Sequence, residues 1–66
     1  MMVATEPRVS ENGRYSLREA CELLGVHKTT MIRWVKEGKI RYGIRRSNYR
    51  KFYLGRELVR FWRAQL

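Results

Sequence analysis

The stretch "KTTMIRWVK", which begins at Lys28, carries polar and basic side chains at spacings that could bind a polyanion. On a helix that turns by 100° per residue, Thr29, Arg33 and Lys36 lie within about 60° of one another. The guanidinium fork of Arg33 can bond O6 and N7 of a guanine together, whereas hydroxyl and ammonium groups suit phosphate. Lys28 and Thr30 lie near the helix start, whose dipole attracts phosphate. We take these five side chains as candidate DNA contacts; the alternative is a solvated helix face.

A second polar cluster lies in the stretch "RRSNYR" further along the chain. It consists of Arg45, Arg46, Asn48 and Arg50, which are also candidate DNA contacts. An arginine inserted into a narrow minor groove meets an enhanced negative potential, and arginines can instead hold phosphates without reading sequence. The alternative is a charged strand edge that prevents pairing between molecules. Which arginine would enter a groove is left open.

The charge of the chain is concentrated around these two clusters. Fifteen Lys and Arg against six acidic residues give a net charge of +9. Residues 28–51 contain nine of the basic residues and one acid, Glu37, so their net charge is +8. Residues 1–27 carry −1 and residues 52–66 carry +2 by the same count. So contiguous a basic segment is the electrostatic footprint of a protein that binds nucleic acid, rather than of general solubility.

A short amphipathic helix precedes the first cluster. Ser16 and Glu19 have the spacing of a capping box, which marks a helix start. The apolar face of this helix contains Leu17, Ala20, Cys21 and Leu24. Gly25 follows where a left-handed residue would end the helix.

A second helix pattern begins after a two-residue link. Its apolar face contains Met31, Trp34 and Val35, which we expect to be core residues, and Gly38 ends it. His27 lies at the N-cap of this helix, so capping or a phosphate contact is its natural role. Two short helices joined by a tight glycine-containing turn predict a helix-turn-helix.

A β-hairpin over residues 39–54 would position the second cluster. β-Forming residues lie on both sides of its turn, which we place at Arg45–Asn48. Two strands alone are marginally stable, so the hairpin must pack on the helices. Its aromatic residues are Tyr42, Tyr49, Phe52 and Tyr53. Packing on the helices is the expected role, and stacking on the bases of single-stranded DNA or RNA is the alternative.

A third helix is predicted over residues 55–66. Its apolar stripe contains Leu58, Phe61, Trp62 and Gln65. Val59 and Leu66 fall to one side of this stripe. They are candidate protein contacts, either with a neighbouring copy on DNA or with a recombinase. The alternative is that scattered apolar residues on a surface are ordinary.

The rest of the sequence bounds the class of protein. Residues 1–13 are polar and without periodicity, which predicts a flexible N-terminal tail before a single domain over residues 14–66. No apolar run approaches the ~20 residues that cross a bilayer, and the start lacks the apolar region of a signal peptide. We therefore expect a cytoplasmic, nucleoid-associated protein with no membrane partner. Cys21, the single cysteine, is expected to be buried and inert.

The stretches "YSLREACELLGV", "TTMIRWVKEGKI" and "REL" resemble the small winged helix-turn-helix domains of the MerR-like and excisionase-like group. The resemblance covers about residues 15–62. It implies a mainly α fold with a small β-hairpin as the wing. The second helix would enter the major groove of duplex DNA, and the wing would reach the adjacent minor groove. The hairpin turn departs from the family's Gly-rich turn followed by two arginines, and the family's regulators continue into a long dimerising helix where this sequence ends.

The function that we expect is architectural rather than catalytic. No nucleophile–base pair, paired carboxylates or Gly-rich phosphate loop is present, so we expect no enzyme, no cofactor and no metal site. One such module touches few base pairs, so specificity would need several copies or DNA bending. We expect a sequence-preferring, excisionase-like factor that binds double-stranded DNA cooperatively, with self-association on DNA. Alternatives are a small transcriptional regulator, a nucleoid-organising protein or, from another class, a protein-interaction module for a recombinase or other partner.

Overall fold

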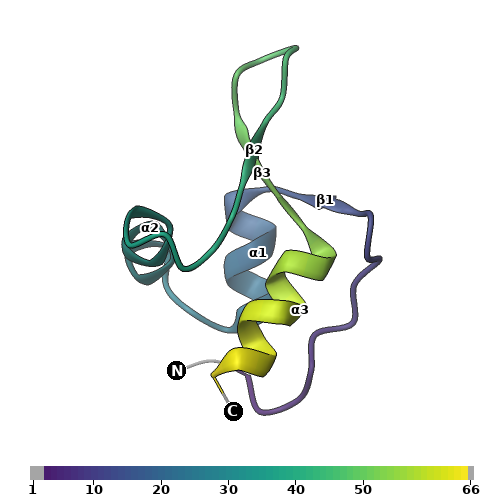
Figure 1. Cartoon of the computed structure of the whole chain (residues 1–66), viewed down its shortest axis with the longest axis vertical. Helices are drawn as coiled ribbons and strands as arrows, with labels where there is room; N and C mark the ends of the chain where they lie inside the picture. Colours follow the sequence, from purple (N-terminus) through teal and green to yellow (C-terminus); the bar gives the residue numbers. More distant parts are fainter. Residues whose placement is uncertain (1–2, 66) are drawn as a thin grey trace.

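Residues 3–65, the part of the chain that the computed structural model describes, fold as three helices and a three-stranded antiparallel sheet (Figure 1). The elements in chain order are β1 (Arg14–Tyr15), α1 (Leu17–Leu24), α2 (Lys28–Lys36), β2 (Gly43–Ile44), β3 (Lys51–Leu54) and α3 (Gly55–Ala64). This arrangement confirms the predicted winged helix-turn-helix. None of the helices in the described part is long and apolar enough to span a bilayer.

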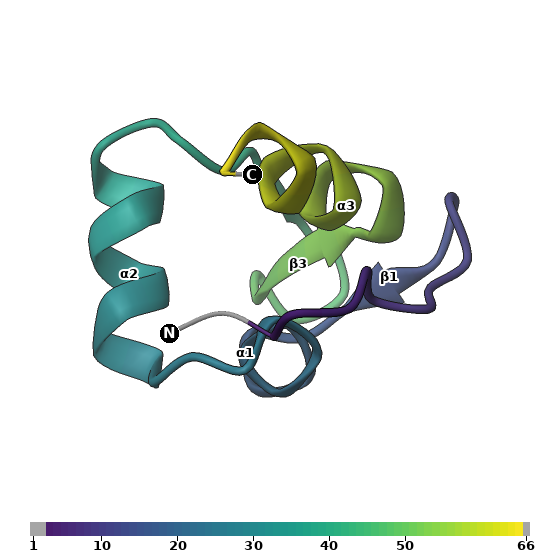
Figure 2. The same cartoon turned by 90° about the horizontal axis from the view of Figure 1, so that it is seen from below.

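Helices α1 and α2 form the predicted helix-turn-helix. At the start of α1 the Glu19 amide donates to the Ser16 hydroxyl at 3.1 Å, and the Ser16 amide donates to Glu19 Oε1 at 3.0 Å. These two bonds confirm the capping box. Gly25 ends α1 with a φ of 70°, a left-handed conformation that favours glycine. The short link then sets α2 steeply across α1, as Figure 2 shows.

The core lies where the three helices meet β3. Its buried side chains are Ala20, Cys21, Leu24, Met31, Ile40, Tyr53, Leu58, Phe61 and Trp62. Trp34 is half-buried and packs against this core, with its ring centroid 4.8 Å from that of Phe61. Gln65, by contrast, is exposed and does not belong to the apolar stripe of α3. Because α3 follows β3 directly, the same core also fixes the base of the β2–β3 hairpin.

The wing is the β2–β3 hairpin with its connecting turn, and it projects beyond the helices (Figure 1). Its ladder begins at Gly43, later than the sequence pattern indicates. Ile40 is buried in the core, whereas Tyr42 and Ile44 are exposed, so these residues do not share one face of a strand. A Cβ on Gly43 would lie 2.4 Å from Phe52 Cζ, which explains a residue without a side chain at this position.

Strand β1 has no counterpart among the elements predicted from the sequence. It pairs with the other edge of β3, with Tyr15 opposite Tyr53. A two-residue strand is too short to show periodicity, so only its tertiary partner reveals it. The pairing makes β3 the central strand, in the order β1-β3-β2, and the wing therefore extends from a strand that is held on both sides.

Residues 3–13 lie against the helices, where the sequence predicts a flexible tail. The Trp62 indole donates to the Val3 carbonyl at 2.9 Å, and the Val3 amide donates to the last carbonyl of α1 at 2.9 Å. At the other end of the segment the Gly55 amide donates to the Gly13 carbonyl at 3.0 Å. The segment is thus hydrogen-bonded to α1 and α3, and the domain boundary at residue 14 stays a prediction. Its mobility stays a prediction.

Candidate nucleic-acid interface

The start of α2 presents several of the polar side chains that the sequence indicates. Lys28, Thr29, Arg33 and Lys36 are exposed, and Thr30 is half-buried. The Thr29 amide donates to Nδ1 of His27 at 3.2 Å, so His27 is the N-cap of the helix. The Thr29 hydroxyl lies 3.1 Å from the same nitrogen. The imidazole is therefore engaged in ordering the helix start, which is one of its two expected roles.

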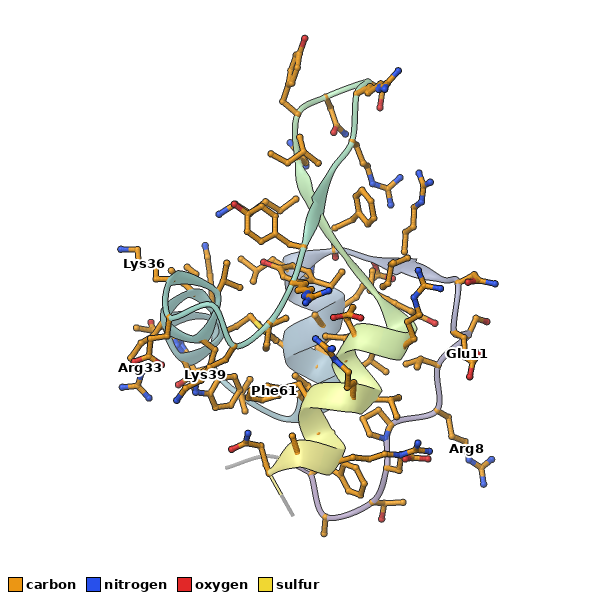
Figure 3. All side chains as sticks on the ribbon, in the orientation of Figure 1. Arg8, Glu11, Arg33, Lys36, Lys39 and Phe61 are labelled. Atoms are coloured by element: carbon orange, nitrogen blue, oxygen red, sulfur yellow. The ribbon has the colours of Figure 1, made fainter. Side chains whose placement is uncertain are left out.

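The two flanks of α2 point in different directions. Figure 3 shows Lys36 on the flank nearer the wing and Arg33 on the opposite flank, the same side as Lys39. An open groove between α1, α2 and the wing is lined from α2 by Lys28, Ile32, Val35 and Lys36, and Arg33 is not part of its lining. The structure thus separates Arg33 from Lys36, which helical spacing alone assigns to the same face. The role of Arg33 as a reader of guanine stays a prediction.

The groove joins the second helix to the wing and has an apolar floor with a basic rim. The floor residues include Leu17, Cys21, Val26 and Tyr53. The basic residues are Arg18, Lys28, Lys36, Arg45, Arg50 and Lys51, against the single acid Glu22. Glu22 is paired with Arg18 at 3.4 Å on the surface of α1. Six cations against one carboxylate give this groove a positive charge that suits a polyanion.

The floor of the groove adds no charge of its own. Burial raises the pKa of the Cys21 thiol above its ordinary value, and burial likewise raises the pKa of the Tyr53 hydroxyl. Both groups are therefore neutral at pH 7. The free thiol of Cys21 is buried, as the sequence predicts. A basic rim over a neutral floor attracts phosphate to the edges, while the centre offers apolar contact.

The four candidate DNA contacts of the wing differ in exposure and in the contacts that their side chains make. Arg45 is half-buried, and its guanidinium lies 5.9 Å from the centroid of the Phe52 ring. Asn48 is exposed but accepts the Arg50 amide through Oδ1 at 3.0 Å, so its side chain helps to shape the turn. Arg46 and the side chain of Arg50 are exposed. Of the four wing candidates, these last two have the greatest freedom to reach a phosphate or a groove.

Sequence reasoning missed three residues at this surface. Ile32 is 38% exposed and lines the groove between Lys28 and Lys36. Its i−4 and i+4 spacing to those lysines is a helical signal that could have identified it. An apolar side chain at this place can contact the methyl group of thymine.

Lys51 also lines the groove, with its Nζ 4.7 Å from the centroid of the Tyr42 ring. Arg18 enters the rim from α1, which only the packing of α1 against the wing could show.

Val59, one of the two proposed protein-contact residues, lies away from this groove. Val59 is half-buried and lines a shallow hollow between α3 and the N-terminal segment, together with Pro7 and Val9. The hollow also contains charged residues, among them Glu6, which pairs with Arg63. Leu66 lies outside the described residues. A protein contact through Val59 and Leu66 stays a prediction.

Comparison with known families agrees with this geometry. Residues 14–66 match the family model described as a helix-turn-helix domain. The match spans α1, α2, the wing and α3, so the chain belongs to this family. No curated protein and no solved structure matches the chain. Within residues 3–65, no group of three or more His, Cys, Asp or Glu residues could hold a metal ion.

Proposed function

We propose that this helix-turn-helix DNA-binding protein binds double-stranded DNA with α2 in the major groove and the wing in the adjacent minor groove. The observation that carries the proposal is the groove whose basic rim comes from both elements. Lys28 and Lys36 lie on its α2 side, and Arg50 and Lys51 lie on its wing side. An α-helix fits the width of the major groove, and phosphates flank that groove on both sides. With α2 in the major groove, the backbone strand between the major and the adjacent minor groove would lie in this protein groove, between the cations of α2 and those of the wing.

The size of the domain favours an architectural, excisionase-like role over single-site recognition by one copy. Its longest extent is 34 Å, which is about one helical turn of B-DNA. A module of this size contacts few base pairs, so several copies or a deformed duplex would be needed to select a genomic site. We therefore propose cooperative, sequence-preferring binding. A transcriptional regulator of the MerR-like kind, or a nucleoid-organising protein, would use the same surface with a different arrangement of sites.

The rival proposal is a protein-interaction module that recruits a recombinase or another partner through α3. The apolar residue available for it, Val59, is half-buried beside the N-terminal segment, which leaves less surface for a partner than the basic groove leaves for DNA. We also propose that the protein acts by binding alone, without catalysis.

The groove can be tested by removing its lysines. The Lys28→Ala/Lys36→Ala double variant should bind a random-sequence duplex about tenfold more weakly and with a shallower salt dependence, because phosphate contacts contribute uniformly across sequences. Arg8→Ala is the matched control for each lost charge, because Arg8 is exposed on the far side of the molecule from α2 (Figure 3). Fluorescence anisotropy at several salt concentrations measures both effects. If Arg8→Ala, which removes one charge, caused half the loss in binding free energy caused by the double variant, which removes two, net charge and not this groove would attract DNA.

Arg33 requires a separate measurement. If it reads a guanine edge, Arg33→Ala should leave binding to random duplex within about threefold of wild type and relax the base preference at one position. In vitro selection from a randomised duplex library, done in parallel with wild type and variant, would show this. Unchanged selected sequences would remove Arg33 from the base-reading residues and leave the groove flank of α2 in that role.

A further inference from the structure

Tyr49 at the tip of the wing combines two unusual features. Its side chain is 82% exposed, more than any other large apolar side chain in residues 3–65. Its φ is 57°, and it is the only non-glycine residue with a positive φ in the same part of the chain. A single exposed tyrosine is ordinary, and a bulky residue in the left-handed region is not. The two features together call for a physical explanation.

The turn itself imposes this backbone conformation. The Arg45 amide donates to the Arg50 carbonyl at 2.9 Å, and the Tyr49 amide donates to the Arg45 carbonyl at 2.8 Å. The bond from the Arg50 amide to Asn48 Oδ1 closes the other side of the loop. Glycine or asparagine would adopt the left-handed conformation at less cost than tyrosine. The turn geometry therefore explains the positive φ but does not explain a tyrosine at this position.

Packing within the molecule does not explain the tyrosine either. Tyr49 belongs neither to the core nor to the partly buried residues packed against it. The cation–π contacts of the wing involve the rings of Phe52 and Tyr42. The chain thus has backbone strain at a residue whose aromatic ring is exposed to solvent, in the turn of a wing that projects beyond the helices (Figure 1). Strain of this kind collects at sites that contact a partner.

We propose that the Tyr49 ring enters the minor groove of the bound duplex and packs against its sugars and base edges as an apolar wedge. This inference rests on the proposed function and deepens it. Proteins that use the minor groove combine arginines with apolar side chains that press on the base steps. Here Arg46 and Arg50 are exposed beside Tyr49 in the same turn and supply the cations. The fixed turn also holds the ring in place before binding, which reduces the entropy lost on association.

Opposite effects on stability and on binding distinguish this role from a structural one. Tyr49→Asn relieves the strain and removes the ring, so its melting temperature should rise by about 4 °C while its affinity for duplex falls about tenfold. Tyr49→Phe keeps the ring and loses only the hydroxyl, so its affinity should stay within about twofold of wild type. Ser47→Ala, an exposed residue of the same turn, is the matched control and should change neither quantity.

The experiment uses thermal unfolding and anisotropy with an A·T-rich duplex, with and without distamycin, a small molecule that fills the minor groove. Distamycin in the minor groove should abolish the difference in duplex affinity between wild type and Tyr49→Asn. Wild-type affinity in Tyr49→Asn would overturn the proposal. So would equal losses in Tyr49→Phe and Tyr49→Asn, because they would assign the contact to the hydroxyl and a phosphate. Failure of the wild-type protein to bind any duplex would instead overturn the proposed function itself.

Discussion

Leu58 in α3 and Tyr49 at the wing tip are both large side chains, yet the first is fully buried and the second is 82% exposed. Around Leu58, residues from all three helices and β3 fill the core, and each is constrained by its neighbours. Around Tyr49, the turn fixes the backbone and the side chains project into solvent. The difference shows that neighbouring side chains constrain Leu58 and do not constrain Tyr49, which is available to the partner that we propose. Substitutions in the two regions should therefore affect different measurements.

The largest effect should come from Leu58→Ala. Removing a fully buried leucine costs about 3 kcal/mol, and a domain of this size has only about 3–10 kcal/mol of stability. Thermal unfolding should show a fall of about 15 °C or no folded baseline at all, with DNA binding lost together with the fold. Val59→Ala, the half-buried neighbour, is the control and should cost about 1 kcal/mol. A fall in melting temperature of less than about 2 °C in Leu58→Ala, on the order of a tenth of the expected fall, would contradict the core described here.

Gly43→Ala tests the junction between the two regions. The added Cβ would meet the Phe52 ring, which already has Arg14 at 4.9 Å and Arg45 at 5.9 Å from its centroid, so the ring has little room to move. Overpacking here should cost about 1–3 kcal/mol and displace the wing, with duplex affinity about thirtyfold lower.

Gly38→Ala provides the comparison for that variant. Gly38 has a φ of +75° and nothing within 4 Å of an added Cβ, so alanine there introduces backbone strain without a clash. It should lower stability by about 1 kcal/mol and leave DNA affinity unchanged. If both glycine variants bind duplex like wild type, the close approach of Phe52 to Gly43 does not position the wing.

Arg46→Ala/Arg50→Ala should show the reverse of the Leu58 result. Both side chains are exposed, so the melting temperature should stay within about 2 °C of wild type. Duplex affinity should fall about tenfold, and the log–log salt slope should become less steep by about 1.8 if each arginine contacts one phosphate. Anisotropy titrations at four salt concentrations measure the slope. A lower affinity with an unchanged slope would show that these arginines read base edges or groove shape rather than phosphate.

The smallest effect concerns the capping box of α1. Ser16→Ala should cost about 1 kcal/mol of stability, because the Ser16 hydroxyl accepts a hydrogen bond from the Glu19 amide at the start of α1. The hydrogen bonds from the Ser16 amide and hydroxyl lower the pKa of the Glu19 carboxyl below 4.5. A carboxylate with a lowered folded-state pKa stabilises the fold above pH 4.5, and this contribution is lost as the pH falls through the folded-state value.

Glu19→Gln should therefore be less stable than wild type at pH 6, with the difference shrinking as the pH falls below 4.5. Urea unfolding at a series of pH values checks this dependence. A difference that is constant over the whole series would mean that the charge of Glu19 does not contribute to the cap.

The parts of the fold that the sequence predicts are those encoded by nearby residues. The capping box, Gly25 and the apolar positions of α1, α2 and α3 act over three or four residues, so their spacing reveals them. Strand β1 and the contact between Val3 and Trp62 join residues that are distant in the chain and follow no local period. They form because the core brings α1, β3 and α3 together, and no local pattern contains that information.

The same distinction applies to the interface. Charge and helical spacing indicate the basic residues of α2 and the wing. Which flank of α2 faces the wing depends on how α2 packs across α1, so helical spacing groups Arg33 with Lys36 although only Lys36 lines the groove. Tyr49 carries no charge signal, and its exposure and positive φ appear only in the folded turn.

The most direct test of DNA binding by the groove and the wing is the salt dependence of wild-type binding. Anisotropy would compare a labelled random-sequence duplex with a single strand of equal length over a salt series. If α2 and the wing contact about six phosphates, the log–log slope on duplex should be near −5, with weaker binding to the single strand. No duplex binding at moderate salt, or tighter binding to the single strand, would contradict the proposed docking of α2 and the wing.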